Sequence, residues 1–293
     1  MMLKMYVPLI AATCIVSIYA IDYGYDYDNV FDGYRQRIIE GIVPTNHPLP
    51  FLVFISVGRD LLSTCTGTIL SPRYVLTALS CFSVAAQRLK ITTREAERLM
   101  VVRAGSQYRY EGLPYSVASS YITSKTSKNK AFDDIMILKL NRDIVFDYLT
   151  TAPVTLVRWK PKLGETVAIA GYGVHVTGAE PNYKTKSYVI GNTTVMKNDR
   201  YCKPKKSYEF CAGGINQGRS DGGDRGGPVM KKINGKYVQV GMILEGKTIH
   251  NPGNRFSTLF DVQDSGLYLT IDFFCDMIQR YTDGAAYCKK IRI

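Results

Sequence analysis

The chain has 293 residues, of which 46% are hydrophobic. This composition is sufficient for a globular core and excludes a purely disordered or fibrous protein. Lysine and arginine number 37 against 25 acidic residues, which gives a formal net charge of +12. Such a charge favours polyanionic partners such as sulfated glycans, nucleic acid or acidic membranes, but it also serves ordinary solubility, and composition leaves both interpretations open.

Residues 1–20 have the layout of a secretory signal peptide. Lys4 supplies the positive start, Met5 to Tyr19 the apolar stretch, and Ala20 a small residue for cleavage. A membrane anchor fits less well, because the apolar run is short and no basic stop-transfer segment follows it. No later stretch is long enough to span a membrane. The mature protein is therefore expected to be secreted and extracellular.

Residues 21–37 form an acidic, tyrosine-rich segment with four aspartates and two arginines. The segment lacks a core pattern and predicts a disordered pro-segment. Two alternatives stay open: sulfation of its tyrosines, and docking of the segment on the basic body. Because residues 1–20 carry a single charged side chain, a lysine, the body after residue 37 has a net charge of +13.

After residue 50, short apolar runs alternate with breaks of Gly, Pro, Asn and Ser. Many short strands separated by turn signals indicate an all-β sandwich or barrel protein. One helix is expected, from about Ile271 to Tyr281, where Phe274 and Ile278 continue a near-helical spacing of apolar residues. The expected strands are 51–57, 68–70, 74–78, 99–103, 135–140, 166–170 and 237–244.

Seven cysteines are present, and one of them, Cys14, lies in the signal peptide. The six that remain are an even number, as expected for disulfides formed in an oxidising compartment. Spacing alone allows many pairings. No Cys-x-x-Cys or clustered Cys/His pattern indicates zinc, and neither a metal nor a cofactor is expected. The six cysteines are Cys65, Cys81, Cys202, Cys211, Cys275 and Cys288.

The most informative stretch is Gly223-Asp224-Arg225-Gly226-Gly227-Pro228. It resembles the Gly-Asp-Ser-Gly-Gly-Pro nucleophile loop of the chymotrypsin/trypsin-like serine proteases. In that family two backbone N–H groups of the loop, at the positions of Gly223 and Arg225 here, converge on the developing oxyanion. The serine of the loop attacks the substrate carbonyl. Arg225 stands at the serine position, and a guanidinium offers no lone pair for such an attack.

Other stretches resemble the same family in the same order. Residues 74–81 are similar to Val-Leu-Thr-Ala-Ala-His-Cys, with Ser80 at the position of the histidine base. Asp134 begins a stretch similar to Asp-Ile-Ala-Leu-Leu, whose aspartate orients that histidine. A serine hydroxyl has no useful basicity near neutral pH. The triad-equivalent residues are therefore not expected to be catalytic. Similar stretches also occur at 171–173, 211–213 and 266–278, so the match runs from Ile38 to about Tyr281.

The resemblance implies an all-β fold of two six-stranded antiparallel Greek-key barrels with a C-terminal helix. The domain would span residues 38–282, with barrels at about 38–150 and 151–270, followed by a tail at 283–293. The resemblance also implies the disulfides Cys65–Cys81 and Cys202–Cys211, which leaves Cys275 and Cys288 to pair with each other.

The family's activation site is matched by Arg37-Ile38. In active members, cleavage frees an ammonium, here that of Ile38. The ammonium inserts beside the aspartate that precedes the nucleophile, here Asp224.

The specificity pocket implied by the resemblance is altered. Arg219 stands where trypsin-like enzymes place an aspartate, and Glu245-Gly246 follows Leu244 where the family has Ser-Trp-Gly. A basic pocket floor would repel arginine and lysine side chains. It would either bind an acidic side chain or pair with Glu245 and close, and closure is the preferred interpretation.

Replacement of the histidine by Ser80 predicts a shortage of hydrogen-bond donors around Asp134. We therefore expect an Asp134–Arg225 ion pair, with the Ser80 hydroxyl joining it, to fill the former site. In the alternative, Arg225 points to solvent and local hydroxyls satisfy Asp134. The histidines, which are interpreted as ordinary loop residues, are His47, His175 and His250.

These features predict a monomeric, secreted serine protease homologue without proteolytic activity, acting as a binding or regulatory protein. Its partners would be proteins of an extracellular protease cascade or sulfated glycans, with no specific nucleic acid. The alternative is residual or unconventional hydrolysis, because the oxyanion turn is kept. Asn192 begins a sequon and predicts glycosylation. The basic clusters expected to bind glycans are Lys125/Lys128/Lys130, Lys203/Lys205/Lys206 and Lys231/Lys232.

Overall fold

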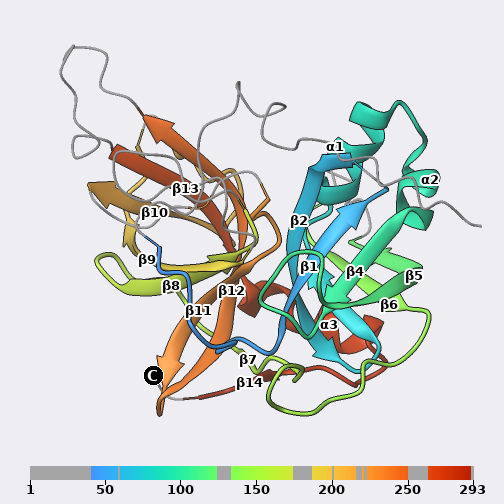
Figure 1. Cartoon of the computed structure of the whole chain (residues 1–293). Helices are drawn as coiled ribbons and strands as arrows, with labels where there is room; N and C mark the ends of the chain where they lie inside the picture. The colour runs from blue at the N-terminus through green and yellow to red at the C-terminus, as the bar shows by residue number, and fades with distance from the viewer. Residues whose placement is uncertain are drawn as a thin grey trace, which may run out of the picture. The chain divides into compact units, whose positions relative to one another are not determined.

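Six antiparallel strands close a first barrel in the order β1-β2-β3-β6-β5-β4 (Figure 1). The computed structural model describes residues 41–58, 60–123, 133–173, 187–199, 201–215, 220, 223–249 and 263–291. All of these belong to one unit, Arg35–Ile293. The strands of the first barrel are β1 (Leu52–Val57), β2 (Asp60–Ser71), β3 (Tyr74–Thr77), β4 (Met100–Ala104), β5 (Leu113–Ile122) and β6 (Met136–Leu140).

The second sheet has eight strands in the order β11-β8-β9-β10-β13-β12-β7-β14. Pairing between β11 and β12 closes six of them into a ring, all antiparallel. The short strands β7 and β14 add outside the ring and pair in parallel, so the expected six-stranded antiparallel barrel is confirmed with two extra strands at its edge. The strands are β7 (Leu156–Val157), β8 (Thr166–Gly171), β9 (Val189–Met196), β10 (Glu209–Ile215), β11 (Pro228–Ile233), β12 (Lys236–Ile249), β13 (Gln263–Thr270) and β14 (Cys288–Lys289).

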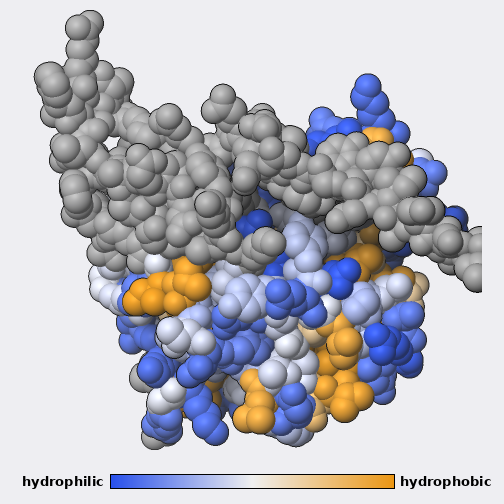
Figure 2. All heavy atoms as spheres, in the orientation of Figure 1, coloured by the Kyte–Doolittle hydropathy of each residue, from blue (hydrophilic) through white to orange (hydrophobic). Residues whose placement is uncertain are grey.

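Two helices that the sequence interpretation missed follow β3. Helix α1 (Ser80–Leu89) buries Cys81, Phe82 and two alanines on one face, and it ends at Lys90 in the left-handed region with φ 54°. Helix α2 (Thr93–Arg98) begins at a capping box in which Thr92 and Glu95 bond each other's backbone N–H. The Thr-x-x-Glu pattern is a recognised start signal that was present in the sequence. Hydrophilic side chains cover much of this helical pair in Figure 2.

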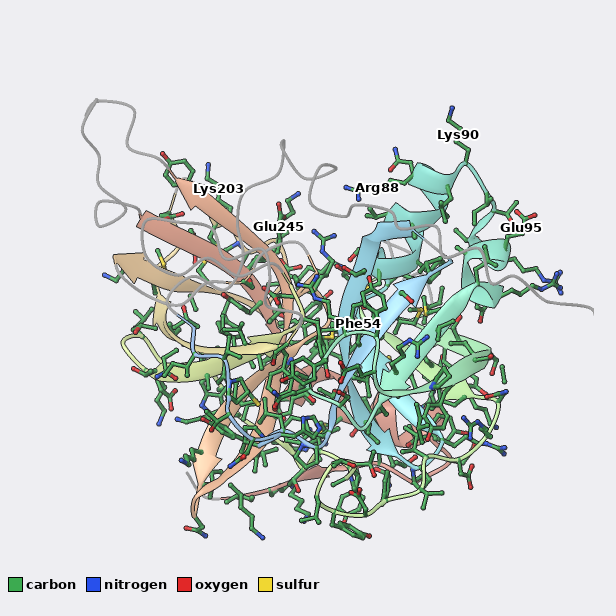
Figure 3. All side chains as sticks on the ribbon, in the orientation of Figure 1. Phe54, Arg88, Lys90, Glu95, Lys203 and Glu245 are labelled. Atoms are coloured by element: carbon green, nitrogen blue, oxygen red, sulfur yellow. A yellow bond between two sulfur atoms is a disulfide. The ribbon has the colours of Figure 1, made fainter. Side chains whose placement is uncertain are left out.

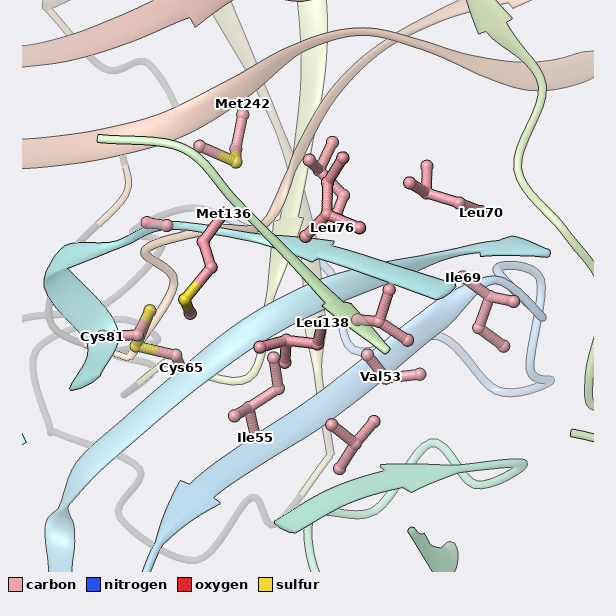
Figure 4. Close-up of a cluster of buried hydrophobic side chains, with 14 of the residues drawn as sticks. Val53, Ile55, Cys65, Ile69, Leu70, Leu76, Cys81, Met136, Leu138 and Met242 are labelled. Atoms are coloured by element: carbon pink, nitrogen blue, oxygen red, sulfur yellow. A yellow bond between two sulfur atoms is a disulfide. The ribbon is translucent and has the colours of Figure 1, made fainter. Parts of the chain in front are cut away.

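The first barrel is filled by aliphatic side chains from several strands. Figure 4 shows Ile55 and Leu138 on one face of the sheet and Leu76 on the other, on the side where Met242 of β12 lies, and all four belong to one cluster. The core therefore continues from the first barrel into the second. Strand β1 is buried at almost every position, because its outer face is covered as well as its inner one. Burial of this apolar area is the main stabilising term of the fold.

The C-terminal helix is confirmed, as a 3₁₀ turn η3 (Ile271–Phe274) that continues into α3 (Cys275–Tyr281). Arg158 binds Asp272 at 3.1 Å and Asp276 at 3.0 Å and fixes the helix to the second barrel. No helix among the described residues is long and apolar enough to cross a membrane. All three implied disulfides are confirmed, as Cys65–Cys81, Cys202–Cys211 and Cys275–Cys288.

Candidate functional site

The turn that carries Arg225 is held by the first barrel. Thr66 of β2 donates its backbone N–H to the Arg225 carbonyl at 3.0 Å and its hydroxyl to the Gly223 carbonyl at 2.9 Å. Gly226 has φ +83°, and a β-carbon there would lie 2.3 Å from the Thr77 hydroxyl oxygen. Only glycine fits this position. In the described part of the chain, the N–H groups of Gly223 and Arg225 donate to no protein oxygen.

Within the described residues, Ser80 supplies both hydrogen bonds that the Asp134 carboxylate receives. Its backbone N–H donates to Oδ1 at 2.6 Å, and its hydroxyl donates to Oδ2 at 2.9 Å. Ser80 is the first residue of α1, so its N–H is one of the helix donors that lack an intrahelical acceptor. A carboxylate at this end of a helix is also favoured by the helix dipole. Asp134, from the bend before β6, therefore caps the N-terminus of α1.

The expected ion pair between Asp134 and Arg225 is wrong. Among the described residues, no hydrogen bond or ion pair joins the Arg225 guanidinium to Asp134. The ion pair was predicted because Asp134 was expected to lack hydrogen-bond donors. It does not lack them, since Ser80 at the start of α1 brings two donors to the carboxylate. Asp134 is instead satisfied locally, as in the alternative interpretation, and the half-buried Arg225 lines a cavity with it.

Asp224 is fully buried beside two glycines. Its Oδ1 accepts the Gly173 N–H at 2.7 Å, and the Gly173 carbonyl accepts Nη2 of Arg109 at 2.5 Å. A β-carbon at Gly173 would lie 2.4 Å from Asp224 Oδ1, so a larger residue is excluded there. Burial lowers the pKa of Arg109, while the nearby Tyr110 and Asp224 act in the opposite direction. Arg37 and Ile38, the expected activation residues, lie outside the described residues.

The two walls of the expected specificity pocket touch each other. A β-carbon added at Gly246 would lie 1.5 Å from the Ser220 carbonyl oxygen. Ser220 is fully buried, and its hydroxyl donates to the Tyr268 hydroxyl at 3.4 Å. The backbones of Gly246 and Ser220 therefore approach each other closely at this point. The expected pairing of Arg219 with Glu245 lies outside the described residues, because Arg219 is not among them.

A cavity of about 390 Å³ lies where the active site of a protease would be expected. It is lined by Asp134, Arg225, Glu245 and the cations Lys203 and Lys205. Lys203 and Glu245 are both labelled in Figure 3. The cavity therefore combines two of the three triad-equivalent positions with charged side chains of both signs.

Two lysines of the expected basic clusters form ion pairs with acidic residues of the same chain. Lys206 binds Asp133 at 2.5 Å, and Lys231 binds Glu165. Burial alone would raise the pKa of Asp133, but the hydrogen bonds from Lys206 and from Tyr208 hold it below its usual value. The remaining described members of the clusters are exposed: Lys203, Lys205 and Lys232. The third cluster, Lys125/Lys128/Lys130, lies outside the described residues.

The remaining predicted positions lie apart from this cavity. His47 bonds the Thr150 carbonyl through Nε2 at 2.9 Å and packs against Tyr188. Asn192 of the sequon is exposed on β9; its glycosylation stays a prediction. No group of metal-ligating side chains occurs among the described residues. His175 and His250 are outside the described ranges.

Two residues of the site were not found from the sequence. Thr66 holds the Arg225 turn, and Arg109 reaches Gly173 from a loop of the first barrel. Neither belongs to a motif, and their partners are more than 60 residues away along the chain. No local signal could have identified them.

A family model described as Trypsin matches residues 38–263. The chain is 27% identical over 233 residues to CLIP domain-containing serine protease B15 of Anopheles gambiae, covering 68% of this chain and 59% of that protein. It is 28% identical over 237 residues to phenoloxidase-activating enzyme 1 of Spodoptera litura, covering 72% and 60%. The chain thus spans about three fifths of the length of these curated relatives.

Among solved structures, the fold is similar to that of the scabies mite inactivated protease paralogue S-I1, with a TM-score of 0.57. The two chains are 22% identical, and the match covers 83% of this chain and 98% of that one. A likeness at this level of identity supports the two-barrel fold alone.

Proposed function

Since the chain belongs to the trypsin family of serine proteases, we propose that it is a secreted member without proteolytic activity that acts by binding other molecules. The observation that carries this proposal is the position of Arg225. It stands where the family has its nucleophilic serine, in a turn whose flanking residues match the family's Gly-Asp-Ser-Gly-Gly-Pro. Its guanidinium is always protonated and cannot attack a carbonyl. Ser80 supports the same conclusion, because its hydroxyl donates to Asp134 and offers no base to an incoming nucleophile.

The contact between Gly246 and Ser220 is a second support. A protease discriminates substrates by the side chain that enters its specificity pocket, and contact between two walls of this pocket supports its closure. Loss of the nucleophile, of the base and of the pocket together favours a binding role over slow hydrolysis. One curated relative is named for activating phenoloxidase, which makes a protein of an extracellular protease cascade a reasonable partner class for this chain.

The test is covalent labelling of the purified full chain with a fluorophosphonate probe, before and after cleavage at Arg37, with trypsin as the positive control. The expected result is no labelling and no peptide hydrolysis in either form. Stoichiometric labelling of this chain, located by peptide mass spectrometry, would refute the proposal.

Residual hydrolysis is the second candidate, because the Gly223 and Arg225 N–H groups have no described protein acceptor. Enzymes stripped of their triad keep rate enhancements of about 10³–10⁴ over water. Activity of that size would appear as slow ester turnover without a burst. Mutation of Gly223 to alanine should abolish it if these amides are responsible.

Binding of sulfated glycans is supported by the exposure of Lys203, Lys205 and Lys232. Electrostatic binding weakens steeply as salt rises. Elution from immobilised heparin should therefore shift to lower salt in a Lys203→Gln/Lys205→Gln variant. The matched control is Lys206→Gln, whose cation is already paired with Asp133. Elution of the unaltered protein no later than a neutral protein would contradict glycan binding.

A further inference from the structure

Three cations from two segments line the cavity of about 390 Å³: Lys203 and Lys205 from the segment before β10, and Arg225 from the nucleophile turn. None of the three has an ion-pair partner among the described residues. The neighbouring Lys206, in contrast, is paired with Asp133. The chain therefore neutralises a lysine beside the cavity but leaves those that line it available.

The carboxylates of the cavity are held by their own chain. Asp134 accepts both donors of Ser80. Glu209 Oε2 accepts the backbone N–H groups of Lys205 and Lys206 at 2.7 and 3.2 Å. Glu245 also has an interaction of its own. The acids thus have fixed partners, whereas the donors of the three cations are free for a ligand that brings acceptors.

The shape of the cavity limits the kind of ligand. Its volume lies at the lower end of the range typical of sites for small ligands or a few side chains. Gly246 and Ser220, which would wall the family's specificity pocket, approach each other closely. We therefore place the ligand against Arg225 and not in that pocket. The cavity is open to solvent at the exposed Lys203 and Lys205. A site of this size, with a single guanidinium fork at Arg225, suits one carboxylate side chain of a peptide, whereas a sulfated glycan follows a longer row of cations.

We propose that this cavity is a receptor site for an acidic segment of a partner protein, with Arg225 as its central carboxylate ligand. The planar guanidinium can donate two parallel hydrogen bonds to one carboxylate. The N–H groups of Gly223 and Arg225 lie on the same turn and are also without a described acceptor. Lys203 and Lys205 attract the flanking acids. The inference rests on the proposed function, since Arg225 here binds a group instead of reacting with it.

The test is fluorescence anisotropy with the full chain and a short fluorescein-labelled peptide rich in aspartate and tyrosine. The expected result is saturable binding that weakens with salt, and a loss of affinity of at least about tenfold for the counterpart with asparagine in place of aspartate. Arg225→Met should lower the affinity for the aspartate peptide by a similar factor. The affinity of Arg225→Lys should lie between those of Arg225→Met and the unaltered protein, because lysine keeps the positive charge but not the two parallel donors of the guanidinium. Lys203→Gln/Lys205→Gln should also weaken binding, without altering the turn.

The matched control is Lys236→Met, which removes one exposed charge on β12 outside the cavity and should leave affinity within about twofold of the unaltered protein. Equal binding of the aspartate and asparagine peptides would overturn the proposal, as would an Arg225→Met variant that melts normally and binds unchanged. Binding of a heparin oligosaccharide but not of the peptide would assign the site to glycans and overturn it too. Mass spectrometry of the peptide separates the two hypotheses: a cleaved peptide contradicts the proposed function, whereas an intact, unbound peptide contradicts only this inference.

Discussion

The hydroxyl and the backbone N–H of Ser80 donate to the two carboxylate oxygens of Asp134, at 2.9 and 2.6 Å. One small residue at the start of α1 thus provides two hydrogen bonds to a half-buried carboxylate in the bend before β6. The acid that in active relatives orients a base here stabilises a helix terminus. Asp134 therefore has a structural role in this chain without a histidine beside it, because it accepts the two donors of Ser80.

Replacement of Ser80 by alanine should destabilise the protein by about 1–3 kcal/mol, because Asp134 loses one of its two donors while half-buried. Urea denaturation would measure the free energy of unfolding. Ser83→Ala is the matched control, since Ser83 is exposed on the same helix and makes only a 3.4 Å bond to the Ser80 carbonyl. Equal stability of the two variants would contradict the role assigned to the Ser80 hydroxyl.

Restoration of the triad by Ser80→His and Arg225→Ser should restore labelling by a fluorophosphonate probe without restoring cleavage after arginine or lysine. The reason is the contact between Gly246 and Ser220, which supports closure of the pocket for a substrate side chain. Labelling and hydrolysis of tripeptide substrates would be measured on the same sample. Efficient cleavage by this variant would show that the walls separate on binding and would refute the closed pocket.

Arg109 and Asp224 should stabilise the protein jointly, since both bind Gly173. Arg109 donates to its carbonyl, and Asp224 accepts its N–H. Arg109→Met and Asp224→Asn should each cost about 3 kcal/mol, because each leaves the other group buried with less compensation. The double variant should cost less than the sum of the two. Arg94→Met, on the exposed face of α2, is the control for loss of an arginine. Strict additivity in thermal denaturation would exclude the coupling.

His47 should make stability depend on pH. Burial lowers its pKa below 6.5, although the bond to the Thr150 carbonyl and the charge of Asp147 oppose the shift. The unfolded chain therefore binds the proton more readily than the native one. The contribution of neutral His47 is complete above about pH 6.5 and is lost as pH falls below that value. His47→Gln should flatten the stability curve in this window, and parallel curves for the two proteins would contradict the assignment.

The sequence predicted the fold and the altered nucleophile position. The strand patterns predicted an all-β sandwich or barrel protein, and the resemblance to the chymotrypsin/trypsin-like proteases implied the two barrels and the disulfide pairing, which the structure confirms. Replacement of the nucleophile by an arginine is visible in a single residue, because reactivity belongs to the side chain itself. Helix α1 was missed, although the apolar spacing of its buried face and the capping box of α2 were both present in the sequence.

Only the tertiary structure decided how the altered site is filled. The Ser80–Asp134 bonds, the reach of Arg109 to Gly173 and the contact of Gly246 with Ser220 each join segments far apart along the chain. Their occurrence depends on ångström-scale packing of two barrels and a helix, which residue patterns do not encode locally. The expected Asp134–Arg225 ion pair failed for this reason: the charges were identified correctly, but the position of a helix terminus determined which donor reached the acid.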